Sequence, residues 1–328
     1  MSKFAVIIPY FGTFKPSIVL FLESCNRNPG IDWHIFTDCN IPEGITLNSN
    51  VKWHTSTLET ISSLVNEKLG FQITMSRAYK LCDLKPFYGL LFSDYLNCYE
   101  YWGYGDTDVI YGNVVSYLEK INYSRYDKIN WMGHLCFIRN QQVCNEAVLK
   151  KIPGTIDAET VLLREDNLGF DERDFNRKWL ASGMTIHTGK WAADIDIHYW
   201  RMRCADLGTF HILLNTKEIK YAPKNYRNQI FALLDGNIYR IYLKGNRVHF
   251  EEFAYIHFRK EVPILLDDIH TSSYLFSRDG FLPLHYNEKQ LHTYQIVRNL
   301  IDAHNSQEKP WQELLSFLYY VRRRYFKK

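Results

Sequence analysis

The feature that most constrains the fold is a short, uninterrupted apolar run at the start of the chain. Residues 4–8 read Phe-Ala-Val-Ile-Ile, and the run stops at Pro9. A continuous run of this length is typical of a strand buried on both faces, as in a parallel sheet. Further short strands are predicted at 33–36 and 51–54. Helical spacing of apolar residues lies at 16–26 and 58–69. This alternation continues to residue 112 and predicts a mostly parallel α/β sheet flanked by helices.

The pattern loosens after residue 112. Before residue 112, a helix is also predicted at 86–96 and a strand at 99–102. After it, helices are predicted at 114–121 and 140–150, a strand at 131–138, and loops with short helices over 153–200. Residues 238–258 have the period of a small antiparallel hairpin with a Gly245-Asn246 turn. Helical spacing returns at 290–303 and 311–326. We expect a main domain over 1–260 and a helical extension over 261–328 packed on it.

Composition excludes several classes of protein. The chain of 328 residues has a net charge of only +3, which argues against wholesale nucleic-acid binding. Its seven cysteines form no C-x-x-C pair, so we expect neither a disulfide scaffold nor a structural zinc site, and a reducing, cytoplasmic location. No apolar run approaches the ~18 residues that span a bilayer, and we expect no signal peptide.

The most informative motif is Asp106-Thr107-Asp108, which follows an aromatic strand. An Asp-x-Asp triplet often only caps a helix or forms a turn. In open α/β sheets, however, ligands bind outside the carboxyl ends of the strands. Two carboxylates there create a negative field that a hard divalent cation bridging to phosphates would neutralise. We therefore predict a metal and phosphate site here.

Taken together, these motifs resemble the GT-A class of nucleotide-sugar glycosyltransferases. More closely, the chain resembles an uncharacterised bacterial family from capsule and lipopolysaccharide gene clusters. The matching stretches are 4–12, 32–38, 79–86, 102–112, 133–135 and 255–258. The resemblance implies a GT-A-like, Rossmann-related fold with a nucleotide-binding half at about 1–112 and an acceptor-side half at about 113–260. It also implies that the protein binds Mn²⁺ or Mg²⁺ and uses a nucleotide-sugar donor, with a UDP-sugar as the first candidate. The implied acceptor is a glycan or a lipid-linked glycan.

The same resemblance assigns the metal ligands. Asp108 would be the principal ligand, and Asp106 would contact the metal or the ribose. His257, late in the chain, would complete the coordination shell, although a buried strand histidine is the simpler interpretation of that residue alone. Lys260, which follows it, would contact the diphosphate, or would merely be a solvated residue at a strand end.

Acid–base chemistry points to a second group of residues. Glu172, and after it Asp171, are candidates for the base that takes the proton of the acceptor hydroxyl. Both also fit a solvated start of a helix. His134, beside a predicted strand, would contact the acceptor or the donor sugar, with a purely structural role equally open.

The donor is expected to meet residues from the first third of the chain. Lys80, Asp83 and Lys85 precede a predicted helix start, where anions are favoured, and would hold phosphate or donor sugar unless they form a surface ion pair. By resemblance, the nucleotide pocket would be lined by Pro9, Tyr10, Phe11 and Asp38.

The C-terminal stretch 311–328 joins apolar residues to five basic residues among its last seven. It is typical of an interfacial helix on an anionic bilayer, and equally of a packing helix with a solvated tail. Peripheral association with the cytoplasmic face of the inner membrane is thus one expectation. Two alternatives to a glycosyltransferase stay open: a nucleotidyl- or phosphotransferase using the same carboxylates, and a non-catalytic carbohydrate-binding assembly protein.

Overall fold

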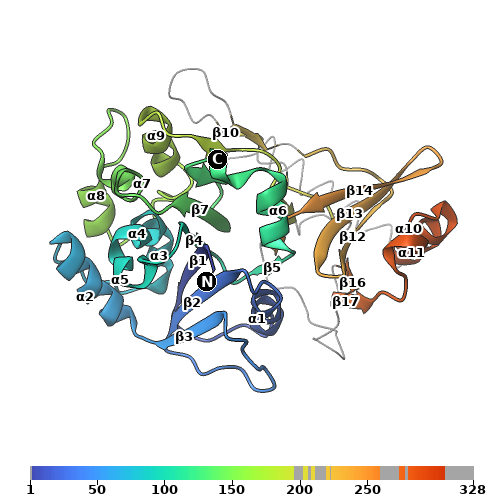
Figure 1. The fold of residues 1–328 in the computed structure, drawn as a ribbon, viewed down its shortest axis with the longest axis horizontal. Helices are drawn as coiled ribbons and strands as arrows, with labels where there is room; N and C mark the ends of the chain where they lie inside the picture. The colour runs from blue at the N-terminus through green and yellow to red at the C-terminus, as the bar shows by residue number, and fades with distance from the viewer. Residues whose placement is uncertain are drawn as a thin grey trace.

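The computed structural model describes residues 2–195, 202–205, 208–210, 219–221, 223–258, 273–277 and 280–306, and the structural statements below concern these residues. They form a mixed α/β fold in which helices flank a seven-stranded, mostly parallel sheet, and a five-stranded antiparallel sheet lies beside it (Figure 1). The fold class predicted from the alternation of strands and helices is confirmed.

The N-terminal apolar run forms an interior strand of the main sheet. It pairs in parallel with strands on both sides, as a doubly buried strand should. In spatial order the sheet consists of β3 (Val51–Thr55), β2 (Ile31–Thr37), β1 (Phe4–Tyr10), β4 (Tyr101–Gly105), β7 (Leu135–Arg139), β6 (Lys128–Ile129) and β8 (Ile186–His187).

Side chains of β1 alternate between two cores because successive residues of a strand point to opposite faces. Phe4, Val6 and Ile8 belong to one core, and Ala5 and Ile7 belong to the other. The first face is covered by α1 (Ile18–Asn26) and α6 (Val114–Lys120) (Figure 1). The helices on the second face are α2 (Leu58–Leu69), α3 (Leu81–Leu84), α4 (Tyr88–Leu91), α5 (Ser93–Leu96), α7 (Gln142–Asn145), α8 (Ala158–Leu163) and α9 (Asp174–Ala181).

Helix α2 has the predicted bounds because its ends are marked locally. The Thr57 side chain accepts a hydrogen bond from the Thr60 N–H, and Gly70 ends the helix with a φ of 75°.

The helix predicted over 86–96 is instead a series of short turns: a 3₁₀ helix at Lys85–Phe87 is followed by α4 and α5. Phe92 breaks the series with a non-helical backbone while its side chain is buried. The helix predicted over 140–150 is likewise short, with α7 followed by a 3₁₀ turn at Glu146–Leu149. Further 3₁₀ turns lie at Ala78–Lys80 and Tyr123–Arg125.

Three smaller sheets complete the described fold. One joins β5 (Val109–Tyr111), β15 (Tyr255–Phe258) and β9 (Ala192–Ile195), and β10 (Gly208–Phe210) pairs with β11 (Ile219–Tyr221). The antiparallel sheet contains, in order, β14 (Arg247–Phe253), β13 (Asn237–Lys244), β12 (Gln229–Leu234), β16 (Tyr274–Ser277) and β17 (Gly280–Pro283). The pairing of β13 with β14 confirms the predicted hairpin.

The segment after residue 260 is not entirely helical, contrary to expectation. Strands β16 and β17 extend the sheet begun by β12, because their apolar residues bury the same face. Helices α10 (Glu288–Leu291) and α11 (Tyr294–Ser306) cover the opposite face, so helical packing is present further along. The division of the chain at residue 260 stays a prediction.

Some predictions fall outside the described residues. These are the contact assigned to Lys260 and the helix and basic tail at 311–328. Among the residues that are described, no helix is both long and apolar enough to cross a membrane.

Candidate active site

A pocket of about 640 Å³ opens at the carboxyl ends of β1 and β4. Its volume is within the range of small-molecule sites, and the ends of parallel strands are where open α/β sheets bind ligands. Most of the residues predicted from sequence line it: Pro9, Tyr10, Phe11, Lys85, Asp106, Asp108, His134, Asp171, Glu172 and His257.

Backbone hydrogen bonds hold the Asp-x-Asp segment between β4 and β5. The Asp106 N–H donates to the His134 carbonyl at 3.0 Å, and the Phe258 N–H donates to the Asp108 carbonyl at 3.0 Å. The segment is therefore tied to the start of β7 on one side and to the end of β15 on the other. Residues far apart in sequence reach one pocket in this way.

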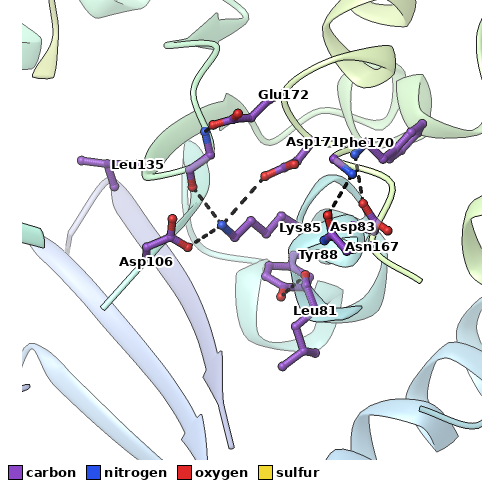
Figure 2. Close-up of polar contacts among 12 residues, drawn as sticks. Leu81, Asp83, Lys85, Tyr88, Asp106, Leu135, Asn167, Phe170, Asp171 and Glu172 are labelled. Carbon is purple, nitrogen blue, oxygen red and sulfur yellow. Dashed lines mark hydrogen bonds and ion pairs between the residues drawn. The ribbon is translucent and has the colours of Figure 1, made fainter. Parts of the chain in front are cut away.

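Lys85 occupies the centre of a buried polar cluster (Figure 2). Its Nζ lies 2.5 Å from Asp106 Oδ1, 3.1 Å from the Gly133 carbonyl oxygen and 3.8 Å from Asp171 Oδ2. Burial alone would lower the pKa of Lys85, but the two carboxylates outweigh it and raise that pKa. Lys85 thus stays charged and neutralises part of the carboxylate cluster at the pocket.

The two acidic residues predicted as the base have different surroundings. Burial raises the pKa of Asp171 to about 7, against the lowering effect of Lys85. Glu172 is half-buried, and its Oε1 accepts a hydrogen bond from the Gly133 N–H at 2.9 Å. A Cβ at Gly133 would lie 2.5 Å from Asp171 Oδ2, so a larger residue here would displace that carboxylate. The backbone of Gly133 therefore holds Glu172, and the missing side chain leaves room for Asp171 beside it.

His257 lies on β15 between two carboxylates. Its Nδ1 is 2.7 Å from Asp194 Oδ1, and its Nε2 is 3.5 Å from Asp108 Oδ1. Burial would lower the pKa of His257, but Asp108 and Asp194 outweigh it and raise that pKa to about 10. Its ring stacks on that of His134 with centroids 3.6 Å apart. Burial and the neighbouring His257 lower the pKa of His134, which is therefore neutral and able to act as a ligand.

These side chains fit a divalent cation. Ligand atoms of Asp106, His134 and His257 all lie within 4.8 Å of one another. Among the described residues, Nδ1 of His134 is buried and has no hydrogen-bond partner, as expected for a nitrogen that a ligand would occupy. The sequence predicted Asp106 and His257 in this group, but it named Asp108 as the principal ligand, and Asp108 is not one of these three residues. It assigned His134 to a sugar and did not identify Asp194, whose signal is a lone acidic residue in the otherwise apolar strand β9.

Lys80 and Asp83 do not line the pocket, contrary to expectation, and they are not a surface pair either. They form a buried ion pair of 2.9 Å, and the Asp83 carboxylate also accepts hydrogen bonds from the N–H groups of Leu168 and Phe170. Figure 2 shows Asp83 directed toward this loop and away from Asp106. The pair therefore fixes the loop that leads to Asp171.

Aromatic residues at the end of β1 and just after it also line the pocket. The rings of Tyr10 and Phe14 stack with centroids 4.8 Å apart, and both residues line the pocket. Asp38 is exposed and is not a lining residue. Its carboxylate accepts a hydrogen bond from the Gly12 N–H at 3.1 Å, which shapes the turn after β1. Asp38 therefore lies outside the pocket lining, and its contact with the nucleotide stays a prediction.

Comparison with known proteins gives a family without an assigned activity. The model of a "Family of unknown function (DUF6625)" matches residues 6–285. Curated proteins gave no match. Among solved structures, the chain is similar to a "putative nucleotide-diphospho-sugar transferase" from Desulfovibrio desulfuricans G20, with 10% identity, a TM-score of 0.31, and coverage of 57% of this chain and 79% of that one. The function therefore has to be argued from the site itself.

Proposed function

The chain belongs to the family of unknown function DUF6625, and from its pocket we propose that it is a metal-dependent glycosyltransferase that uses a nucleotide-diphosphate sugar. The observation that carries this proposal is the convergence of Asp106, His134 and His257 in a pocket at the ends of parallel strands. Asp108, 3.5 Å from His257, adds a second carboxylate.

The chemistry of the transfer requires charge stabilisation. Breaking the anomeric C–O bond leaves a nucleoside diphosphate, so negative charge grows on the departing oxygen while the sugar becomes oxocarbenium-like. A divalent cation held by Asp106, His134, His257 and Asp108 would neutralise that charge. Lys85, buried beside Asp106, supplies a fixed positive charge on the same side of the pocket.

Proton transfer from the acceptor hydroxyl needs a base with a pKa near the working pH. Asp171, with a pKa of about 7, fits this requirement. Glu172 is the neighbouring carboxylate, and its hydrogen bond to the Gly133 N–H suits it to hold a hydroxyl in place. We therefore assign the base to Asp171 ahead of Glu172, the reverse of the order inferred from the sequence.

The nature of the substrates belongs to the same proposal. The stacked rings of Tyr10 and Phe14 are suited to a nucleotide base, and we propose a UDP-sugar as donor. The resemblance of the sequence motifs supports a glycan or lipid-linked glycan of a bacterial surface polysaccharide as acceptor, and a cytoplasmic enzyme that meets it at the inner membrane.

The experiment is a donor screen with matched variants. UDP-sugars are incubated with the full chain and Mn²⁺, and release of UDP is followed by chromatography. Asp106→Asn and Asp108→Asn should each lower turnover by about 10²-fold, since each removes charge that faces the leaving group. Asp94→Asn, an exposed carboxylate outside the pocket, should leave turnover unchanged.

Products distinguish the alternatives. Release of pyrophosphate from nucleoside triphosphates, with no release of UDP from sugars, would favour a nucleotidyltransferase. Sugar binding without any effect of Mn²⁺ or UDP, measured by calorimetry, would favour a non-catalytic carbohydrate-binding protein. Unchanged turnover in both pocket variants would refute the proposed role of these carboxylates.

A further inference from the structure

His257 lies between two carboxylates that the same small sheet positions: Asp194 is on one neighbouring strand, and Asp108 directly precedes the other. Strand β15 pairs in parallel with β9, where His257 lies opposite Asp194. It pairs antiparallel with β5, where His257 lies opposite Val109, the residue that follows Asp108. The register of this sheet therefore sets Asp108, His257 and Asp194 in a row.

The surroundings of the His257 ring leave it little freedom. Asp194 is fully buried, and its Oδ1 lies 2.7 Å from Nδ1. The stacked ring of His134 covers one face of the imidazole. The carboxylate beside Nδ1 holds the proton on that nitrogen, so a divalent cation would displace the proton of Nε2 and bind there. Nε2 is the nitrogen on the side of Asp108, which lines the pocket.

We propose that Asp194 is a positioning residue that orients His257 and keeps its Nε2 available to a divalent cation. This inference rests on the proposed function, because it needs a metal in the pocket. Metal-binding histidines generally donate their second ring N–H to a carboxylate or carbonyl, and loss of that partner typically weakens metal affinity 10- to 100-fold. The competing interpretation is a buried ion pair that only stabilises the fold.

The test measures Mn²⁺ affinity directly, by electron paramagnetic resonance of free Mn²⁺ in titrations of the full chain. An asparagine at 194 can donate an N–H to Nδ1 and so leave the proton on Nε2, where it blocks a metal. Asp194→Asn should weaken Mn²⁺ binding about 10- to 100-fold. In a His257→Ala background the same substitution should have no further effect. Asp127→Asn is the control, because Asp127 also accepts hydrogen bonds, from Thr185 and Arg139, but does not line the pocket.

The outcomes separate the two proposals. If the wild-type chain binds no Mn²⁺, both the proposed function and this inference are overturned. If the wild-type chain binds Mn²⁺ and the Asp194→Asn variant binds it equally well, only this inference is overturned. The same holds if Asp194→Asn lowers Mn²⁺ affinity by the same factor in the wild-type and His257→Ala backgrounds. Should Asp194→Asn fail to fold, ¹⁵N NMR of the wild-type chain loaded with Mg²⁺ decides. A proton on Nδ1 of His257 is expected, and a proton on Nε2 would overturn the inference.

Discussion

Asp171→Asn should change how the stability of this protein depends on pH. The pKa of Asp171 is about 7 in the folded chain, mainly because burial disfavours its charge, and 3.8 is the ordinary value. Between these two values the folded chain binds more protons than the unfolded chain. Stability therefore falls as pH rises through this window.

The size of the effect follows from the two pKa values. Each unit of difference corresponds to about 1.4 kcal/mol, so full ionisation of Asp171 costs about 4 kcal/mol of folding free energy. The asparagine variant carries no such cost, and Lys85 keeps its contact with Asp106. Its free energy of unfolding relative to wild type should therefore increase by about 4 kcal/mol between pH 4 and pH 8.

The assay is urea denaturation across this pH range, followed by the fluorescence of the chain's eight tryptophans. Asp94→Asn, at an exposed ion pair with Lys68, is the control and should stay within about 0.5 kcal/mol of wild type throughout. A constant difference between Asp171→Asn and wild type, or one that shrinks as pH rises, would refute the argument. It would mean that Asp171 is already ionised and stabilised by its ion pair with Lys85.

Two other substitutions probe the framework of the site. Gly133→Ala should lower turnover of the donor sugar about 10²-fold, because the new Cβ would lie 2.5 Å from Asp171 Oδ2 and displace that carboxylate. Steady-state kinetics tests this, and a wild-type rate would contradict the role of the Gly133–Asp171 contact. Asp83→Ala should destabilise the fold by about 3–5 kcal/mol, because it leaves Lys80 buried and uncompensated. In urea denaturation Lys80→Met combined with Asp83→Leu should recover part of that loss, and no recovery would contradict the ion-pair explanation.

Local sequence patterns correctly predict those helices, strands and turns whose structure is determined by their own residues. The apolar run 4–8 predicts a doubly buried strand, and β1 is that strand. Helix α2 has the predicted bounds, and the Gly245-Asn246 turn joins β13 to β14. In each case the period of apolar residues or a turn residue within a few positions decides the structure.

Local spacing also indicated that Asp106 and Asp108 would lie at the mouth of a sheet, since a motif that follows a strand lies at that strand's end. It misjudged Lys80 and Asp83, because sequence alone does not distinguish a charged pair on the surface from one buried under a loop 85 residues away. Burial is a property of the whole fold.

What only the tertiary structure decided is the set of partners around each reactive group. Asp194 meets His257 across 63 residues of sequence, and Lys85 meets Asp106 across 21. These contacts depend on the register between strands that are distant in the chain and on the burial that changes each pKa. Neither can be deduced from local spacing, because a strand's own residues determine which face each side chain occupies but not which strand lies beside it.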